Sequence, residues 1–405
     1  MKILVVCQHY WPENFRVTEI CETLVEQGHQ VTALVGLPNY PTGNIPKEYR
    51  YFRNRKQHRN GVEIRRCFEI GRRQSKIGLA VNYMSYMVSA CIKGLFLRHD
   101  YDVIYSFSTS PVLMSYPGVW LKKFFRKKFC LYILDIWPAC LAAMNVSENA
   151  PLYRIMKKVS RHIYCNADCL LYSSYPFREY LKNVHGIDVP EENYLPQFAD
   201  DVTLQGSSLN KLKENDSDKT LQLVFTGNIG KVQAIDTLVQ AAALLREQDI
   251  RWHIVGDGAA YAQMKEMADQ LHLDHCVRFY GRRPLSEMPQ FFDLADALIV
   301  SMKYDALMND TLPGKVQSYM ASGKPIIAPI AGEAARVVKE AGAGLTCEPE
   351  NPEALAETIM NFKALSCDER SGMGSNAYTY YEHTFSKKVH MQHLTDCITQ
   401  LVNGE

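Results

Sequence analysis

Short, unbroken apolar runs recur along this chain of 405 residues, and segments with helical spacing of apolar residues separate them. In the first half these runs occupy residues 2–7, 29–35, 102–106, 129–134 and 167–172, and residues 62–67 alternate apolar and polar residues as a strand does. In the second half they occupy residues 221–225, 252–255, 277–280, 297–300 and 325–328. An uninterrupted apolar strand is buried on both faces, as in a parallel sheet that helices cover on each side. The pattern therefore predicts an α/β protein built from doubly wound parallel sheets.

The series is interrupted by a polar stretch at residues 206–219 that lacks periodicity (GSSLNKLKENDSDK). Such a stretch is typical of a linker or loop near a domain boundary, and 405 residues suit two domains better than one. We therefore expect one α/β domain over residues 1–205 and a second over residues 206–384. Residues 385–405 are predicted to form a terminal helix.

The two halves carry opposite charge, although the whole chain is nearly neutral. Residues 1–200 have 26 Lys and Arg against 17 Asp and Glu, whereas residues 201–405 have 19 against 27. Neither the net charge of +1 nor any local pattern indicates a nucleic-acid partner. The first half, with basic and aromatic residues concentrated at 50–59 and 120–128, is instead expected to face an anionic membrane surface.

The longest apolar stretch, residues 77–97, is interrupted by polar residues, among them Lys93. Burying Lys93 in lipid would cost roughly 2.5–3.5 kcal/mol, so we expect a soluble or interfacial helix here. Only five apolar residues follow Lys2, which is too few for a signal peptide. The 12 cysteines form no CxxC pair and lie mostly in apolar runs, so we expect a reducing, cytoplasmic compartment and no metal site.

A glycine-containing turn follows the first strand of the second half. Gly227, Asn228 and Gly230 precede Lys231 and a helix. Glycine lets a backbone approach a ligand closely, and the free N–H groups at a helix start attract an anion. Lys231 would add a positive charge at the same place. The alternative is an ordinary strand–helix turn whose lysine is solvated.

A second such turn, Gly256-Asp257-Gly258, follows the next strand. It resembles the start of a dinucleotide-binding fingerprint. Tyr261 occupies the third glycine position, however, and the loop after the first strand of the chain has no glycine. A Rossmann-type cofactor is therefore not expected, although Gly256 and Asp257 stay candidates for ligand binding.

Residues 310–325 predict a short helix with a cation in its first turn. Thr311 is expected to cap the helix and Pro313 to occupy its first position, while Gly323 ends it. Lys315 then lies in the first turn, where the helix dipole disfavours a positive charge by roughly a few tenths of a kcal/mol. This placement indicates that Lys315 serves an anion such as a diphosphate; the alternative is a solvated surface lysine.

Six motifs occur in a fixed order along the chain. They are WPENFRVTEICETLVEQGHQVTALVGLPNYPTG, ILDIWPACLAA and LPQFADD in the first half, and FTGNIG, FYGRRPLSEMPQFF and TLPGKVQSYMASGKPIIA in the second. With them the chain resembles the GT-B glycosyltransferases of sugar-transferase family four. It is most similar to the bacterial branch that builds capsule, O-antigen and exopolysaccharide repeat units, and within it to fucosamine transferases. The resemblance implies two Rossmann-like domains facing across a cleft, with the last helix returning to the first domain.

The resemblance also implies which residues bind the donor. The family's two glutamates, which seven residues separate, fall at Asp310 and Ser318. Asp310 keeps a carboxylate for donor-sugar hydroxyls, and Ser318 can bond a ribose hydroxyl only as a neutral group. Donor contacts are expected from both glycine turns and the short helix, namely Gly227, Asn228, Gly256, Asp257, Thr311, Leu312, Pro313, Gly314 and Ser318.

The cations expected near the diphosphate also depart from the family. Its Arg after the first strand of the second domain and its Lys five residues on are replaced here by Asn228 and Gln233. Lys231, Arg282 and Lys315 are the expected substitutes. Stabilising the negative charge of the departing diphosphate is usually the largest catalytic contribution, so these three residues are predicted to be catalytic together with Asp310.

The first domain is implied to bind the acceptor. His9, Glu13 and Asn14 follow the first strand at its carboxyl end. His9 is a candidate general base, or a loop histidine. A His-Asp pair that is common in the family is Leu134-Asp135 here, where Asp135 is expected to orient the acceptor or to cap the residues that follow it.

By this resemblance the protein is expected to be a retaining glycosyltransferase that moves a hexosyl or N-acetylhexosaminyl group without a metal or other cofactor. The donor would be a nucleotide-sugar, with UDP favoured over GDP. The acceptor would be a saccharide on polyprenyl diphosphate, with the cytoplasmic enzyme peripheral to the inner face of the cell membrane. One alternative is a UDP-sugar 2-epimerase, which shares the architecture. Another is a catalytically impaired sugar-nucleotide-binding or scaffold subunit, which the departures at Ser318 and Asn228 would suit.

Overall fold

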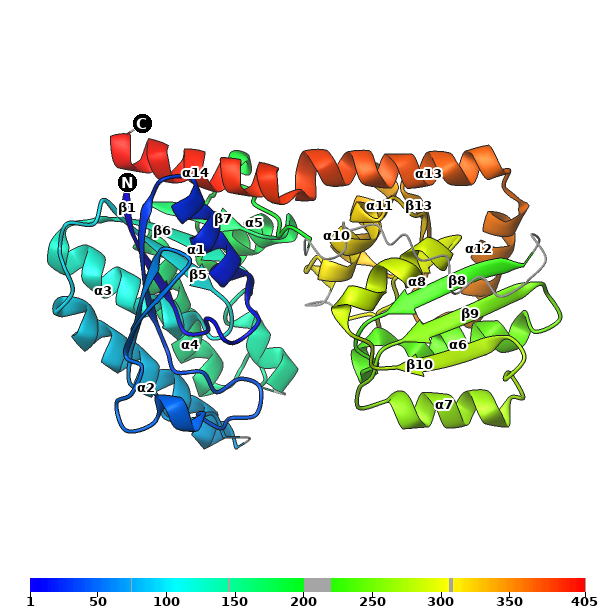
Figure 1. Ribbon diagram of the computed structural model, residues 1–405, viewed down its shortest axis with the longest axis horizontal. Coiled ribbons are helices and arrows are strands. Elements are labelled where there is room, and N and C mark those ends of the chain that lie inside the picture. Colours follow the sequence, from blue (N-terminus) through cyan, green and yellow to red (C-terminus); the bar gives the residue numbers. More distant parts are fainter. Residues whose placement is uncertain (74, 145, 200–219, 306–308, 405) are drawn as a thin grey trace. The chain divides into compact units, whose positions relative to one another are not determined.

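The computed structural model describes the chain except for residues 74, 145, 200–219, 306–308 and 405 and the side chains of residues 143 and 144. The chain forms two compact units, the first made of Met1–Leu195 with Met391–Glu405 and the second of Pro196–His390 (Figure 1).

The limits of the units differ from those expected. The first unit ends at Leu195 rather than at residue 205, and the segment that returns to it begins at Met391 rather than at residue 385. The predicted linker, residues 206–219, lies outside the described residues.

The first unit contains a seven-stranded sheet in the order β3-β4-β2-β1-β5-β6-β7. Its strands are β1 (Lys2–Cys7), β2 (Gln30–Val35), β3 (Lys56–Arg59), β4 (Val62–Arg66), β5 (Val103–Ser108), β6 (Lys128–Ile133) and β7 (Cys169–Tyr172). Every pair is parallel except β3 with β4. The six strands predicted from the sequence are confirmed. The edge strand β3 was missed because its sequence, KQHR, is charged and polar, as edge strands often are.

Helices cover this sheet on both faces, since β5 is buried at every position. They are α1 (Arg16–Glu26), α2 (Lys76–Leu95), α3 (Tyr116–Phe125), α4 (Pro151–Cys165), α5 (Pro176–Tyr180) and α14 (Lys387–Asn403). The last of these lies beside the first, because Thr395 Oγ1 donates to Gln27 Oε1 at 3.0 Å (Figure 1). Among the described residues, none of the helices combines the length and apolar character needed to cross a bilayer.

The second unit contains a six-stranded parallel sheet in the order β10-β9-β8-β11-β12-β13. Its strands are β8 (Leu221–Thr226), β9 (Ile250–Val255), β10 (Val277–Gly281), β11 (Ala297–Ile299), β12 (Ile326–Pro329) and β13 (Gly344–Cys347). Five of them were predicted. The edge strand β13 was not, because its four residues are only partly buried and form no apolar run.

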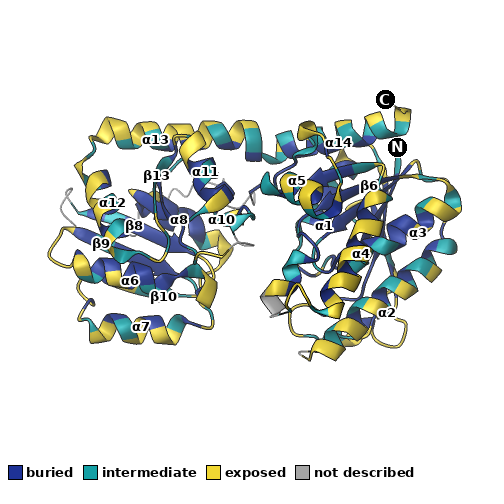
Figure 2. Cartoon of the chain, turned by 180° about the vertical axis from the view of Figure 1, so that it is seen from behind, coloured by how far each residue is buried: buried dark blue, intermediate teal, exposed yellow. Residues whose placement is uncertain are grey.

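Alternate residues of β8 enter two separate cores. The strand itself is buried (Figure 2). Leu223 and Phe225 pack with α6 (Ile235–Leu244), α7 (Tyr261–Gln270) and α12 (Pro352–Ala364). Val224 packs on the other face with α8 (Met288–Leu294), α10 (Gly314–Ala321), α11 (Gly332–Glu340) and α13 (Cys367–Tyr380). Each unit is therefore a three-layer, doubly wound fold, as predicted.

Both sheets wind outward from a central pair of strands. Strand order reverses between β1 and β5 in the first unit and between β8 and β11 in the second. In open α/β sheets, ligands bind beyond the carboxyl ends of the strands at such a reversal. The loops that follow these strands are therefore where functional side chains are expected.

Candidate functional site

The loops after β8 and β9 pack backbone against backbone at the carboxyl end of the second sheet. Gly227 N donates to Val255 O at 2.8 Å, and Ile229 N donates to Asp257 O at 2.9 Å. Gly256 has a φ of +141°, and a Cβ placed on it would lie 1.8 Å from Gly227 O. A side chain cannot occupy that space, so these glycines bring the two loops together.

Gly227 also makes room for Lys315, which reaches the end of β8 from α10. A Cβ on Gly227, whose φ is +126°, would lie 2.5 Å from Lys315 Cε. Lys315 Nζ lies 3.8 Å from the centre of the Phe225 ring. Because Phe225 belongs to one core and α10 to the other, the lysine side chain passes over the end of the strand.

Tyr319 fixes α10 to the same strand one helical turn later. Its hydroxyl accepts a hydrogen bond from Thr226 N at 2.8 Å and lies 3.2 Å from Thr226 Oγ1. Residues four apart share a helix face, so this anchor also positions Lys315. This role could not be predicted from the sequence, where Tyr319 is only one tyrosine within an apolar helix face.

The amine of Lys315 is a buried donor that has no hydrogen-bond partner among the described residues. Burial lowers the pKa of Lys315 from 10.5 to about 7. Buried polar groups in native proteins are nearly always paired, and unpaired, pKa-shifted ones gather at functional sites. An anion beside the amine would favour its charged form, so this end of β8 is suited to a diphosphate.

The two residues that replace the family's cations pair with each other. Asn228 Nδ2 donates to Gln233 Oε1 at 3.2 Å, and the same oxygen accepts from Gly230 N at 3.1 Å. A neutral, hydrogen-bonded amide pair therefore stands where the resemblance implies an Arg and a Lys.

Other predicted donor residues surround this end of the sheet. Lys231, Asp257 and Arg282 are exposed. Arg282 follows the edge strand β10, and β9 lies between β10 and β8 in the sheet. Asp310 and Ser318 are partly buried, before and within α10.

The prediction that Thr311 caps α10 is wrong. Pro313 is the N-cap, α10 begins at Gly314, and the N-cap side chain makes no capping hydrogen bond. Pro313 has an extended ψ of 135°, and a proline also keeps the preceding Leu312, which is buried, out of helical conformation.

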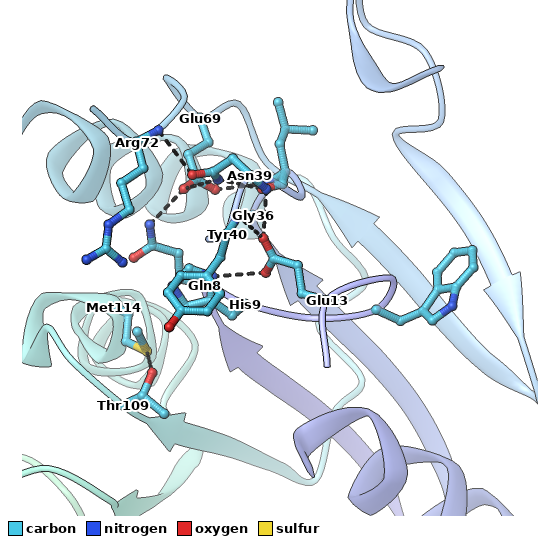
Figure 3. A network of polar contacts seen from close by, with 12 residues as sticks. Gln8, His9, Glu13, Gly36, Asn39, Tyr40, Glu69, Arg72, Thr109 and Met114 are labelled. Atoms are coloured by element: carbon cyan, nitrogen blue, oxygen red, sulfur yellow. Dashed lines mark hydrogen bonds and ion pairs between the residues drawn. The ribbon is translucent and has the colours of Figure 1, made fainter. Parts of the chain in front are cut away.

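In the first unit, His9 and Glu13 form a buried pair at the end of β1 (Figure 3). His9 Nδ1 lies 2.9 Å from Glu13 Oε2. The other carboxylate oxygen of Glu13 accepts from the backbone N–H groups of Asn39 at 2.7 Å and Tyr40 at 2.6 Å. Glu13 thereby fixes the histidine ring, whereas Asn14 is exposed.

A second buried carboxylate, Glu69, lies beside this pair and was not predicted (Figure 3). Its Oε1 accepts from the side-chain amides of Gln8 at 2.7 Å, Asn82 at 2.7 Å and Asn39 at 2.9 Å. Burial raises the pKa of Glu69 to about 7 despite these hydrogen bonds. The network joins the ends of β1, β2 and β4 to α2, and no local sequence pattern could have revealed it.

Asp135 follows β6, on the far side of β5 from β1. Burial raises the pKa of Asp135, and hydrogen bonds with Ser110, in the loop after β5, partly oppose the rise. Asp135 is thus held by the neighbouring loop. In the described part of the chain, no three His, Cys, Asp or Glu side chains gather as a metal site would require.

Two family matches cover most of the chain. Residues 14–196 match the glycosyl transferase 4-like domain, and residues 208–380 match glycosyl transferases group 1. The chain is 24% identical over 351 residues to the probable glycosyltransferase WbjE of Pseudomonas aeruginosa, covering 83% of this chain and 84% of WbjE. It is 24% identical over 382 residues to the putative colanic acid biosynthesis glycosyl transferase WcaI of Escherichia coli, covering 89% and 91%.

Solved structures share the fold over the whole length. A sucrose-phosphate synthase from Thermosynechococcus elongatus matches with a TM-score of 0.72 at 17% identity, covering 100% of both chains. Anabaena Alr3699/HepE in complex with UDP and glucose matches with a TM-score of 0.68 at 17% identity, covering 98% of this chain and 99% of that one.

Proposed function

Because the chain belongs to the glycosyltransferases of GT-B fold, with a 4-like domain followed by a group 1 domain, we propose that it transfers a sugar from a UDP-sugar to a lipid-linked saccharide. The product would be part of a cell-surface polysaccharide. The name of WcaI, a putative colanic acid biosynthesis glycosyl transferase, supports this setting, and the complex of HepE with UDP supports the nucleotide.

The buried amine of Lys315, which forms no hydrogen bond with any described residue, is the observation that carries the proposal. As the sugar leaves the donor, the bond from its C1 to the diphosphate oxygen breaks and negative charge grows on that oxygen. Lys315 is already desolvated, and Tyr319 anchors its helix to the end of β8, so the amine can meet this charge without rearranging. Preorganised charge of this kind is usually the largest contribution to catalysis.

The other cations and hydrogen-bonding groups have supporting roles in this proposal. Lys231 and Arg282 are exposed and approach the donor from the loops after β8 and β10. The start of α10 adds backbone N–H groups near Gly314. Asp310 and Ser318 take donor-sugar and ribose hydroxyls.

The acceptor hydroxyl attacks C1 from the side of the departing diphosphate, which retains the anomeric configuration. In this route the leaving oxygen takes the hydroxyl proton, so no strong protein nucleophile is needed. His9, fixed by Glu13, and Asp135, fixed by its neighbouring loop, are proposed to orient the acceptor. The acceptor's lipid would place the enzyme at the inner face of the cell membrane.

Transfer is tested with a panel of radiolabelled UDP- and GDP-sugars and a membrane extract. We expect label in the lipid fraction with a UDP-sugar. A changed free donor without an acceptor would identify the 2-epimerase, and tight UDP binding with no turnover would identify the scaffold subunit. Absence of transfer from every donor would refute the proposal.

A further inference from the structure

The solvent side of α2 is apolar along its length. Five of its side chains, at helical spacing, are between 41% and 79% exposed: Ile77, Val81, Met84, Val88 and Ile92. The opposite side, from Asn82 to Gly94, is buried. A helix on the surface of a soluble domain normally presents polar and charged residues to water. The apolar stripe of α2, meaning these five residues, therefore indicates a partner that is not water.

The exposed apolar surface continues onto α3, which lies beside α2 (Figure 2). Gly94 allows the two helices to approach, since a Cβ there would lie 2.7 Å from a methyl group of Leu121. Phe96 at the end of α2 is 83% exposed, and Trp120 and Phe124 on α3 are 40% and 61% exposed. Aromatic residues of this kind favour the boundary between water and lipid.

The charges around the stripe are almost all positive. Between residues 70 and 134 the chain has ten Lys and Arg but only two acidic residues, Asp100 and Asp102. Lys76 is exposed at the start of α2, and exposed Arg98 and Lys123 lie beyond its other end. Like charges on two copies of this surface would repel each other, whereas an anionic surface would be attracted.

We propose that α2 and α3 dock on a bilayer containing anionic lipids, with α2 in the plane of the membrane. The apolar stripe of α2 enters the boundary between headgroups and acyl chains, and the basic residues contact the headgroups. This membrane-binding surface rests on the proposed function, which places the enzyme at the inner face of the cell membrane. It is tested without donor or acceptor, so its failure would leave sugar transfer standing.

The test is co-sedimentation with vesicles of phosphatidylcholine, alone or with one third phosphatidylglycerol. We expect binding to the anionic vesicles, and weaker binding at high salt. The double variant Val88→Asp, Ile92→Asp alters exposed side chains only, and we expect its partition coefficient to fall by about tenfold or more. Leu244→Asp is the matched control, because Leu244 is 56% exposed in the second unit, and it should bind like the wild type.

Fluorescence gives a second readout. Brominated lipids should quench the emission of Trp120 in anionic vesicles, and Trp120→Phe should remove most of the quenching. The proposal is overturned if the wild-type protein does not bind anionic vesicles, or if the double variant binds equally well. It is also overturned if the double variant dissociates a dimer in sedimentation equilibrium, because the stripe would then join two copies.

Discussion

Replacing Lys315 with methionine should stabilise the protein while nearly abolishing transfer. Methionine keeps most of the length and packing of the lysine stem but removes the charge. The pKa of Lys315 is lowered from 10.5 to about 7, and each pKa unit corresponds to about 1.4 kcal/mol. The buried amine therefore destabilises the folded state by at most roughly 5 kcal/mol at pH 6, which Lys315→Met would recover.

The direction of the pKa shift determines the pH range in which Lys315 destabilises the folded protein. The unfolded chain holds the proton of Lys315 up to a pH near 10.5, whereas the folded chain releases it near 7. The stability of the wild-type protein therefore rises with pH between those values because of this group. The advantage of Lys315→Met should be largest below pH 7 and should disappear above pH 10.5.

Transfer should fall by about 10²–10³-fold in Lys315→Met, as expected when one group that stabilises the leaving charge is removed. Affinity for UDP should be highest below pH 7 and should weaken as the pH rises above it, because the free amine loses its proton there. In Lys315→Met the lysine no longer titrates, so the pH dependence of its UDP affinity gives the baseline for the wild-type protein.

The assays are urea unfolding from pH 6 to 10, radiolabelled transfer, and calorimetric titration with UDP. Lys265→Met on α7, where the lysine is exposed, is the matched control and should change none of the three. An unchanged transfer rate, or a Lys315→Met protein less stable than the wild type at pH 6, would refute the reasoning.

Three further changes test other parts of the site. Gly227→Ala places a Cβ 2.5 Å from the Lys315 side chain at a φ of +126° and should weaken UDP binding by about tenfold or more. Gly372→Ala is the control, because its Cβ meets nothing within 4 Å. Titration calorimetry compares the UDP affinities of the two variants. Tyr319→Phe removes the bond to Thr226 and should cost about 1 kcal/mol of stability, with UDP affinity falling as well; equal affinity would mean that α10 is held without it. Burial raises the pKa of Glu69 to about 7, so its contribution to the unfolding free energy declines as the pH rises from 4.5 to 7. Glu69→Gln should therefore make the unfolding free energy, measured by urea unfolding, depend less on pH across that range. An unaltered pH dependence would contradict the shift.

The sequence was sufficient for the fold, but not for the contacts around Lys315. Apolar runs and, for β4, alternation predicted eleven strands, including the edge strands β7 and β10. The edge strands β3 and β13 were missed because β3 is charged and polar and β13 forms no apolar run. The motif around Lys315 correctly indicated a cation at the start of α10.

The same motif could not reveal that the amine is buried. That property depends on Tyr319 meeting Thr226, on the missing side chain of Gly227 and on the Phe225 ring, which are brought together only by the folded sheet. The network of Glu69 was hidden for the same reason, since its partners come from separate elements. The cap on α10 was misplaced by a local rule, because Pro313 excludes the helical conformation from the residue before it.

The path of the chain determines the order in which the two units are completed during synthesis. The second unit interrupts the first, which recovers its last segment only from Met391 onward. The first and last residues of the second unit are in contact: His390 Nδ1 lies 2.8 Å from Pro196 O. A ribosome therefore finishes the whole second unit before it releases the helix that completes the first. A product that stops before Met391 would hold a complete second unit beside an unfinished first one.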